Sequence, residues 1–285
     1  MIFDLHTHTN LSTCAGRDNT WEVLLCRAQE AGVEVLSVTD HNTVGFYTEN
    51  KDIEKYFSGR IVPGIEFSVA LDGVAIELLA YNFDIDTISK WAYEKYGTPK
   101  SRQEKMVKAL ELLVQEHGLE YDYSTTFDGS VYAHEFVLNN LLKYDSSKCL
   151  LANYGVYDRT DFYRISGANT EFPLYLDMDK IWPTAEEIID VVHSAHGVVV
   201  FAHPYNYNEK VDVDNALEKL YLKGVDGIEV YHPSCNQEEL EKLENFAMSH
   251  NLLITGGSDY HGIPRHNDMG VNVEKENSLQ YWRKI

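Results

Sequence analysis

The chain has 285 residues, of which 44% are hydrophobic and 24% charged, values that are ordinary for a soluble globular protein. Its 24 basic and 45 acidic residues give a formal net charge of −21, which repels nucleic-acid phosphates and excludes a broad duplex-binding face. The start of the chain has no signal-peptide pattern, and no run of about 18 apolar residues predicts a transmembrane helix. Four scattered cysteines are too few for a disulfide scaffold. We therefore expect a cytoplasmic protein with no membrane partner, and composition leaves its oligomeric state open.

The first third of the chain alternates short apolar runs with amphipathic ones. The strand at 2–5 ends at His6, the helix at 20–31 ends before Gly32, and the buried strand at 33–39 continues into Asp40. Further strand patterns follow at 61–62, 65–68 and 74–81.

The hydrophobic period changes in the middle of the chain. Residues 102–116 carry Met106, Leu110 and Val114 on one helical face, and residues 134–142 repeat the pattern. Residues 150–178 are rich in Tyr and Asp and show no clean period. We therefore expect a mainly helical insertion at 88–178, between two parts of one domain at 1–87 and 179–285.

The alternation of helices and strands returns after the insertion. Thr184 and Glu187 have the spacing of a capping box at the start of a helix. The expected elements are helices at 184–195, 211–223 and 238–251 and strands at 198–202, 227–231 and 252–255. Strands separated by helices of this length predict an α/β fold with a parallel sheet.

Polar residues stand at the carboxyl end of nearly every predicted strand. His6 and His8 are two residues apart in an extended segment, so both imidazoles can reach one cation. Asp40-His41, Glu66 and Asp259-x-His261 each follow an apolar run, where an unpaired buried carboxylate would cost several kcal/mol. Imidazole together with carboxylate suits Zn²⁺, Mn²⁺ or Fe²⁺. The convergence of strand ends on one face therefore predicts a metal site, although two histidines alone could be ordinary strand-edge residues.

Five ordered motifs, HTHTNLS, SVTDHN, PGIEFS, FAHP and TGGSDYHG, resemble those of the PHP (polymerase and histidinol phosphatase) family. The resemblance covers residues 1–86 and 182–270 and is similar to stand-alone bacterial phosphoesterases of that family. It implies a distorted (β/α)7 TIM-like barrel that holds two or three divalent ions of Mn, Zn or Fe, in the full case a trinuclear metal site. It also implies hydrolysis of phosphate esters by a metal-bridging hydroxide.

The resemblance also implies a set of metal ligands. His6, His8, Glu66 and Asp259 resemble the ligands of a first metal, and Glu66 resembles the carboxylate that bridges to a second. His41 and His261 resemble ligands of a third metal, to which Cys14 is the expected third ligand. A Cys14 thiolate would favour a softer ion, but Cys14 could instead be a half-buried free cysteine.

Two second-metal positions are less clearly matched. Glu77 stands where many family members have a histidine, and it could be a ligand or a salt-bridge partner. His134 resembles another second-metal histidine at a helix start, with a helix-surface histidine as the alternative.

The remaining expectations concern substrate and catalysis. His203 resembles a pocket residue that contacts phosphate or protonates the leaving group, and His232 stands similarly before a proline. Asp4 and Asp40 adjoin ligands and would orient imidazole N–H groups, and we count Asp40 with His203 as catalytic. Arginines that could bind phosphate or the leaving group are Arg102, Arg159, Arg164 and Arg265.

The expected function is metal-dependent hydrolysis of small phosphomonoesters, nucleotide-like or histidinol-phosphate-like. We expect the insertion to cover the barrel mouth and to exclude duplex nucleic acid. The alternatives are a metal-dependent amidohydrolase, which would use the same chemistry on a carbonyl, and a non-catalytic metal-binding regulatory module.

Overall fold

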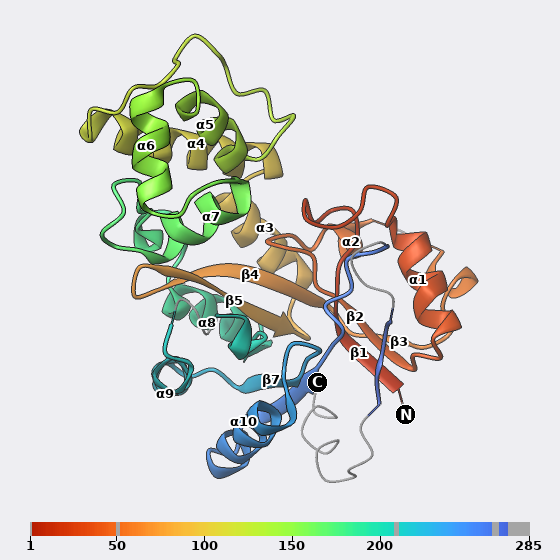
Figure 1. Cartoon of the computed structure of the whole chain (residues 1–285). Coiled ribbons are helices and arrows are strands. Elements are labelled where there is room, and N and C mark those ends of the chain that lie inside the picture. The colour runs from red at the N-terminus through yellow and green to blue at the C-terminus, as the bar shows by residue number, and fades with distance from the viewer. Residues whose placement is uncertain (1, 50–51, 208–210, 264–267, 273–285) are drawn as a thin grey trace. The chain divides into compact units, whose positions relative to one another are not determined.

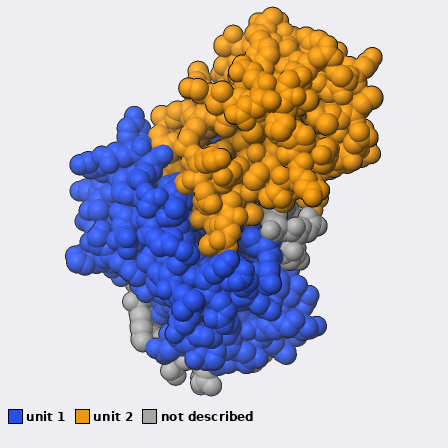
Figure 2. All heavy atoms as spheres, turned by 90° about the vertical axis from the view of Figure 1, so that its left-hand side faces the viewer, with its two compact units in different colours: residues 1–69, 76–95, 183–285 blue, residues 70–75, 96–182 orange. Residues whose placement is uncertain are grey.

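A computed structural model describes residues 2–49, 52–207, 211–263 and 268–272 (Figure 1). The chain divides into two compact units, shown in different colours in Figure 2. Unit 1 comprises residues 1–69, 76–95 and 183–285, and unit 2 comprises residues 70–75 and 96–182. Unit 2 overlaps the segment for which a helical insertion is predicted. No helix within the described ranges is long and apolar enough to cross a membrane.

The first sheet of unit 1 holds the amino-terminal strand at its centre. Its order is β3 (Arg60–Ile61), β2 (Val35–Val38), β1 (Ile2–Thr7) and β9 (Val271–Asn272). The neighbours β1 and β2, and β2 and β3, run parallel, whereas β9 runs antiparallel to β1. The parallel pairing places the carboxyl ends of β1 and β2 side by side. The predicted ligands in the motifs HTHTNLS and SVTDHN therefore lie near one another.

The second sheet has the order β4 (Gly64–Leu71), β5 (Val74–Tyr81), β6 (Val198–Phe201), β7 (Gly227–Tyr231) and β8 (Leu253–Gly256). The pairs β6–β7 and β7–β8 are parallel, but β5–β6 is antiparallel. A two-residue turn causes this reversal, because Asp72 (φ 52°) and Gly73 (φ 80°) both adopt the left-handed conformation of a tight hairpin. The sheet is therefore mixed, where the sequence predicted only parallel strands.

Two isolated parallel bridges connect positions beyond the strand ladders. Thr7 pairs with Tyr260, just after β8, and His41, just after β2, pairs with Glu66 in β4. Closure into one barrel is not detected among the described strands, which form two separate sheets. Both bridges involve segments that carry the predicted ligands, so they fix the backbones of these segments next to one another.

Side-chain caps or a left-handed glycine mark the ends of some of the helices of unit 1. They are α1 (Trp21–Glu30), α2 (Gly45–Thr48), α3 (Ile85–Tyr96, whose last residue belongs to unit 2), α8 (Ala185–Ser194), α9 (Val213–Lys223) and α10 (Gln237–Ser249). The predicted capping box of α8 is confirmed, with Thr184 and Glu187 each accepting the other's backbone N–H. Gly224 ends α9 as predicted, in a left-handed conformation with φ 99°. Short 3₁₀ turns lie at Ile53–Lys55 and Pro204–Tyr207.

Unit 2 is built from four helices around its own apolar core. These are α4 (Pro99–Glu116), α5 (Ala133–Leu141), α6 (Asp145–Asn153) and α7 (Arg159–Ala168), with a 3₁₀ turn at Met178–Lys180. Leu110, Val137 and Phe162 are fully buried in this core. Helix α7 lies in a segment with no clean hydrophobic period, and a capping box of Asp158 and Asp161 starts it. Local capping therefore marks this helix better than its apolar spacing does.

Candidate metal centre

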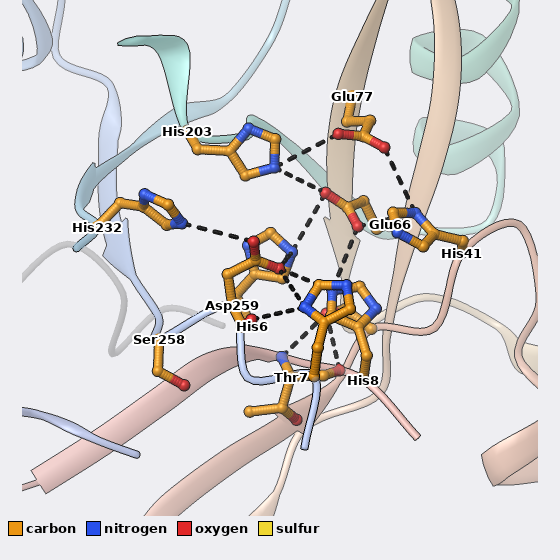
Figure 3. Close-up of polar contacts among 12 residues, drawn as sticks. His6, Thr7, His8, His41, Glu66, Glu77, His203, His232, Ser258 and Asp259 are labelled. Carbon is orange, nitrogen blue, oxygen red and sulfur yellow. Dashed lines mark hydrogen bonds and ion pairs between the residues drawn. The ribbon is translucent and has the colours of Figure 1, made fainter. Parts of the chain in front are cut away.

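A cluster of histidines and carboxylates lies in unit 1, at the ends of strands from both sheets (Figure 3). His6 and His8 come from the end of β1, His41 follows β2, Glu66 lies in β4 and Asp259 follows β8. In Figure 3 the side chains point toward one another, and His6, His8 and Glu66 are fully buried. Backbone at two positions of the cluster is strained, because Asp259 (φ 53°) and His203 (φ 27°) are left-handed without being glycine.

The two carboxylates Glu66 and Asp259 lie between the imidazoles of His6 and His8. His6 Nε2 is 3.2 Å from Glu66 Oε1 and 3.4 Å from Asp259 Oδ1. His8 Nε2 is 3.1 Å from Asp259 Oδ1 and 3.4 Å from Glu66 Oε2. His6, His8 and Asp259 place one ligand atom each within 4.8 Å of the others, close enough to share a metal ion.

Glu229 in β7 fixes the orientation of His6. Its carboxylate oxygens lie 2.9 and 3.1 Å from His6 Nδ1, and an ionised carboxylate can only accept, so Nδ1–H is the donor. His6 Nε2 therefore faces the cluster, where it is buried with no hydrogen-bond partner. Burial opposes charge on this ring, yet the carboxylates of Glu229, Glu66 and Asp259 raise the pKa of His6 well above its ordinary value. The same negative field would hold a cation at Nε2.

His8 presents a lone pair to the same carboxylates. Ser12 Oγ donates to Asp40 Oδ1 (2.6 Å), so His8 Nδ1–H, 3.2 Å away, donates to Ser12 Oγ. Burial, together with the positive charges of His261 and His41, lowers the pKa of His8 to about 3. The neutral ring then directs an unprotonated Nε2 at two carboxylates, an arrangement of acceptors that needs a cation between them.

Asp40 holds the loop that follows β1. Its oxygens accept from Thr9 N (2.8 Å), Thr9 Oγ1 (2.7 Å) and Ser12 Oγ (2.6 Å). Asp40 thus reaches the His8 imidazole through the Ser12 hydroxyl rather than directly. Asp4 similarly accepts from Ser258 N and Oγ at 2.9 and 2.6 Å, which ties β1 to the segment carrying Asp259.

Cys14 lies beside His261 and His41 at one end of the cluster. His261 Nδ1–H donates to the Asp259 carbonyl (2.7 Å), which directs its Nε2 toward Cys14 Sγ at 3.1 Å. His8, His41 and His261 form a second group able to hold a metal ion. Although burial opposes a thiolate, the two neighbouring imidazoles lower the pKa of Cys14 to about 7.

Glu77 and His203 lie beside Glu66 on another side of the cluster, and Glu77 Oε1 is also 3.5 Å from His41 Nδ1. His203 Nε2 is 3.0 Å from Glu66 Oε1 and 3.5 Å from a Glu77 oxygen. Tyr207 donates its hydroxyl to Glu77 Oε2 at 3.2 Å. Burial and the charge of Glu66 raise the pKa of Glu77, so two carboxylates repel one another here. The groups His6–Glu66–His203 and His41–Glu66–Glu77 can each hold a metal ion.

His232 differs from these residues in its proton position. Ser234 N donates to its Nδ1 at 3.2 Å, so the neutral ring carries its proton on Nε2, 3.9 Å from Asp259 Oδ2. This ring offers a donor to the cluster rather than a lone pair.

Other predicted site residues belong to unit 2 or to residues that are not described. His134 starts α5 in unit 2, where its ring packs against Phe162 and Tyr163. Arg159 lies over the ring of Tyr132, 4.6 Å from its centroid, and Arg102 donates to the Gly97 carbonyl, both within unit 2. Arg164 belongs to α7 of the same unit. Arg265 lies outside the described residues.

Three contributors to the cluster were not predicted. Glu229 interrupts the apolar pattern GIEVY, the same signal that marks Glu66 in PGIEFS, and it is fully buried. Ser12 stands within the HTHTNLS motif, and Tyr207 follows the FAHP motif. An acid inside a predicted buried strand would have identified Glu229, whereas Ser12 and Tyr207 depend on loop geometry.

The buried donor set fits divalent metal ions. His6 Nε2 and Glu66 Oε2 are both buried without a hydrogen-bond partner. His6 Nε2 lies 3.2 Å from Glu66 Oε1, and Glu66 Oε2 lies 3.4 Å from His8 Nε2. The overlapping groups of His, Glu and Asp are consistent with a multinuclear site.

Comparisons with known proteins found similar chains, although no protein-family model matches this one. A phosphoribosyl 1,2-cyclic phosphate 1,2-diphosphodiesterase of Eggerthella lenta is 25% identical, covering 92% of this chain and 95% of the relative. The 5′-3′ exoribonuclease Rnm of Escherichia coli is 26% identical, covering 92% of this chain and 85% of the relative.

Two solved structures share the fold over nearly the whole chain. A proposed metal-dependent phosphoesterase of Bifidobacterium adolescentis has a TM-score of 0.64 at 24% identity, covering 98% of this chain and 94% of that one. An amidohydrolase of Chromobacterium violaceum, with bound sulfate and no metal, has a TM-score of 0.62 at 20% identity, covering 95% and 91%. The ordered motifs, the clustered histidines and carboxylates and the near-complete coverage agree: the chain is similar to PHP-type metal-dependent phosphoesterases.

Proposed function

We propose that this protein hydrolyses phosphate esters of small substrates with two or three divalent ions held by the described cluster. The observation that carries the proposal is the pair of buried imidazole nitrogens, His6 Nε2 and His8 Nε2, aimed at Glu66 and Asp259. Bound ions would polarise a phosphoryl oxygen and make a water acidic enough to attack at neutral pH.

The proposed ligands divide the cluster into three overlapping parts. His6, His8, Glu66 and Asp259 hold one ion, and Glu66 also serves the second together with Glu77 and His203. His41, His261 and Cys14 hold the third. His134 stays a prediction as a further ligand, as do Arg159, Arg164 and Arg265 as substrate contacts.

The remaining residues orient these ligands and meet the substrate. Glu229 and the Asp40–Ser12 pair keep the Nε2 atoms of His6 and His8 directed inward. His232, with its proton on Nε2, is the donor proposed to bind a phosphate oxygen. We also propose that the two sheets are halves of a distorted (β/α)7 barrel, which the two isolated bridges support.

Asp259→Asn tests the metal-dependent activity. The neutral amide replaces the charged carboxylate and offers only one oxygen. This variant should therefore lose at least one bound ion and nearly all hydrolysis of an aryl phosphate in the presence of Mn²⁺. Asp214→Asn, on the exposed face of α9, is the matched control and should retain both. Full metal content and turnover in Asp259→Asn would contradict the proposal.

Phosphomonoesters are the first proposed substrates, because a net charge of −21 disfavours long polyanions. Phosphodiesters are the second candidate, because relatives are named a cyclic-phosphate diesterase and 5′-3′ exoribonucleases.

A substrate panel with Mn²⁺ separates these candidates. It contains a nucleoside monophosphate, a ribose cyclic phosphate, a 5′-phosphorylated single-stranded oligoribonucleotide and an N-acyl amino acid. Turnover of the monophosphate alone supports the first candidate, and release of mononucleotides from the 5′ end supports the second. Cleavage of only the N-acyl amino acid would show an amidohydrolase, and no turnover of any compound by the metal-loaded protein would show a non-catalytic module.

A further inference from the structure

The two ends of the cluster differ in donor chemistry. Around His261 the additional donor is the Cys14 sulfur, 3.1 Å from Nε2. His41 lies between the two ends, because its Nδ1 is 3.0 Å from Glu66 and 3.5 Å from Glu77. Around His203 the additional donors are the carboxylates of Glu66 and Glu77, at 3.0 and 3.5 Å. One end therefore offers sulfur and nitrogen, and the other mainly oxygen.

We propose that the centre is selective for two different metals: a thiophilic ion such as Zn²⁺ at Cys14–His41–His261, and a harder ion such as Mn²⁺ at Glu66–Glu77–His203. This inference rests on the proposed metal-dependent function and specifies which ion each end takes. Thiolate ligands select Zn²⁺ and similar ions, whereas carboxylate oxygens suit Mn²⁺ and Mg²⁺.

Both ends are held in place by hydrogen bonds from the surrounding protein. Asp259 O fixes the His261 ring with Nε2 toward the sulfur, and Ser12 Oγ accepts the backbone N–H of His41 at 3.0 Å. At the other end the Tyr207 hydroxyl orients Glu77, and Glu229 accepts the backbone N–H of His203 at 2.9 Å. Preorganised ligands discriminate between ions better than flexible ones, because the geometry cannot relax to suit the wrong ion.

Charge supports the same division. A Cys14 thiolate with two neutral imidazoles would carry one negative charge. Two ionised carboxylates and a neutral imidazole, from Glu66, Glu77 and His203, would carry two negative charges, whose mutual repulsion a divalent cation relieves. The oxygen-rich end thus suits a hard ion bound mainly by charge, and the sulfur end suits a softer ion.

Cobalt reconstitution tests the sulfur end without reference to activity. Co²⁺ bound to a thiolate gives a near-ultraviolet charge-transfer band, so the metal-free full chain loaded with Co²⁺ should show it. Cys14→Ser should abolish the band, while Cys26→Ser, which changes an exposed cysteine in α1, should keep it. Absence of the band in the wild-type chain, or its persistence in Cys14→Ser, would overturn the inference.

Mixed-metal loading tests the division between the ends. After dialysis against equal Mn²⁺ and Zn²⁺, elemental analysis of the wild-type chain should find both ions. Cys14→Asp should lower the Zn to Mn ratio about tenfold or more, as expected for disturbing a metal ligand. Glu77→His should raise the ratio. Identical ratios in all three proteins would contradict a division by donor chemistry.

Alkylation of the wild-type chain covers the case in which a variant does not fold. Zn²⁺ should protect Cys14 from iodoacetamide at concentrations where Mn²⁺ does not, while exposed Cys26 and Cys149 are modified in both samples. Equal protection of Cys14 by the two ions would overturn the inference. A chain that binds no metal at all would refute the proposed function instead, so the two failures are distinguishable.

Discussion

At the scale of single residues, the centre is defined by where each imidazole proton lies. Glu229 accepts a hydrogen bond from His6 Nδ1–H. Ser12, which itself donates to Asp40, accepts one from His8 Nδ1–H. Both Nε2 atoms therefore point into the cluster, toward the carboxylates of Glu66 and Asp259. His232 has the opposite tautomer because Ser234 donates to its Nδ1. His232 thus differs in chemistry from His6 and His8, and hydrogen-bond partners outside the cluster decide the difference.

Glu229→Gln should weaken metal binding although Glu229 touches no proposed ion. The amide can still accept one hydrogen bond, but it loses the charge that holds the His6 proton on Nδ1. We expect metal affinity to fall about 10–100-fold, as for other partners of metal-binding histidines. Titration calorimetry with Mn²⁺ on the full chain measures this change.

Glu238→Gln is the control for this variant, because Glu238 lies on the surface of α10 and pairs with Lys242. Its affinity should match that of the wild-type chain. Affinity in Glu229→Gln within twofold of wild type would show that His6 does not depend on Glu229 for its orientation.

The sequence predicted the cluster's members better than their orientation. His6, His8, Glu66 and Asp259 could be identified because polar residues at strand ends stand out against apolar runs. Glu229 interrupts an apolar strand as Glu66 does, but it belongs to none of the five ordered motifs. Asp40 adjoins His41 in sequence, yet its contacts are with Thr9 and Ser12, which only the fold of the loop determines.

At the scale of elements, local signals decide where helices and strands begin and end. The capping box at Thr184 and the left-handed Gly224 were predictable because they depend on neighbouring residues alone. The Asp72–Gly73 hairpin also has a local signature, but alternation of helices and strands elsewhere favoured a parallel sheet. Helix α7 has too weak an apolar face for its period to be found, and its capping box is the better signal.

Thr184→Ala should lower the free energy of unfolding by about 0.5–2 kcal/mol. The change removes the hydroxyl that accepts Glu187 N and leaves this N–H of the first turn without its partner. Urea denaturation followed by circular dichroism measures the loss, and Thr184→Ser, which keeps a hydroxyl, is the control. An equal loss in both variants would show that the methyl group, and not the cap, is responsible.

The core of unit 2 allows a sharper contrast between two leucines of α4. Leu110 is fully buried and Leu112 is 50% exposed. Leu110→Ala should cost about 2–5 kcal/mol, because it removes buried apolar surface and leaves a cavity, whereas Leu112→Ala should stay within about 0.5 kcal/mol. Thermal unfolding of the two variants compares them, and similar melting temperatures would contradict the described burial.

At the scale of the whole molecule, the acidic composition and the centre are linked. The chain carries 45 acidic residues, and among them Glu66, Glu77 and Asp259 lie together in a cluster of histidines whose negative charge a cation would neutralise. The sequence predicted an α/β class from its strand and helix order, because that order depends on local patterns. Contacts between distant segments, such as the Thr7–Tyr260 bridge, determine which strands are neighbours. These contacts have no signature in the local sequence.

Metal binding should therefore stabilise the folded chain measurably. An ion that binds only the native state adds about 2.7 kcal/mol at a concentration one hundred times its dissociation constant. The effect arises here because the ion removes repulsion between Glu66 and Glu77 and replaces the proton that the carboxylates of Glu66 and Asp259 draw to His6. The melting temperature of the full chain should fall after chelation and recover when Mn²⁺ or Zn²⁺ is restored. Asp259→Asn should show a much smaller recovery, because it lacks a charged ligand of the first ion, and an equal recovery in both proteins would place the stabilising ion elsewhere.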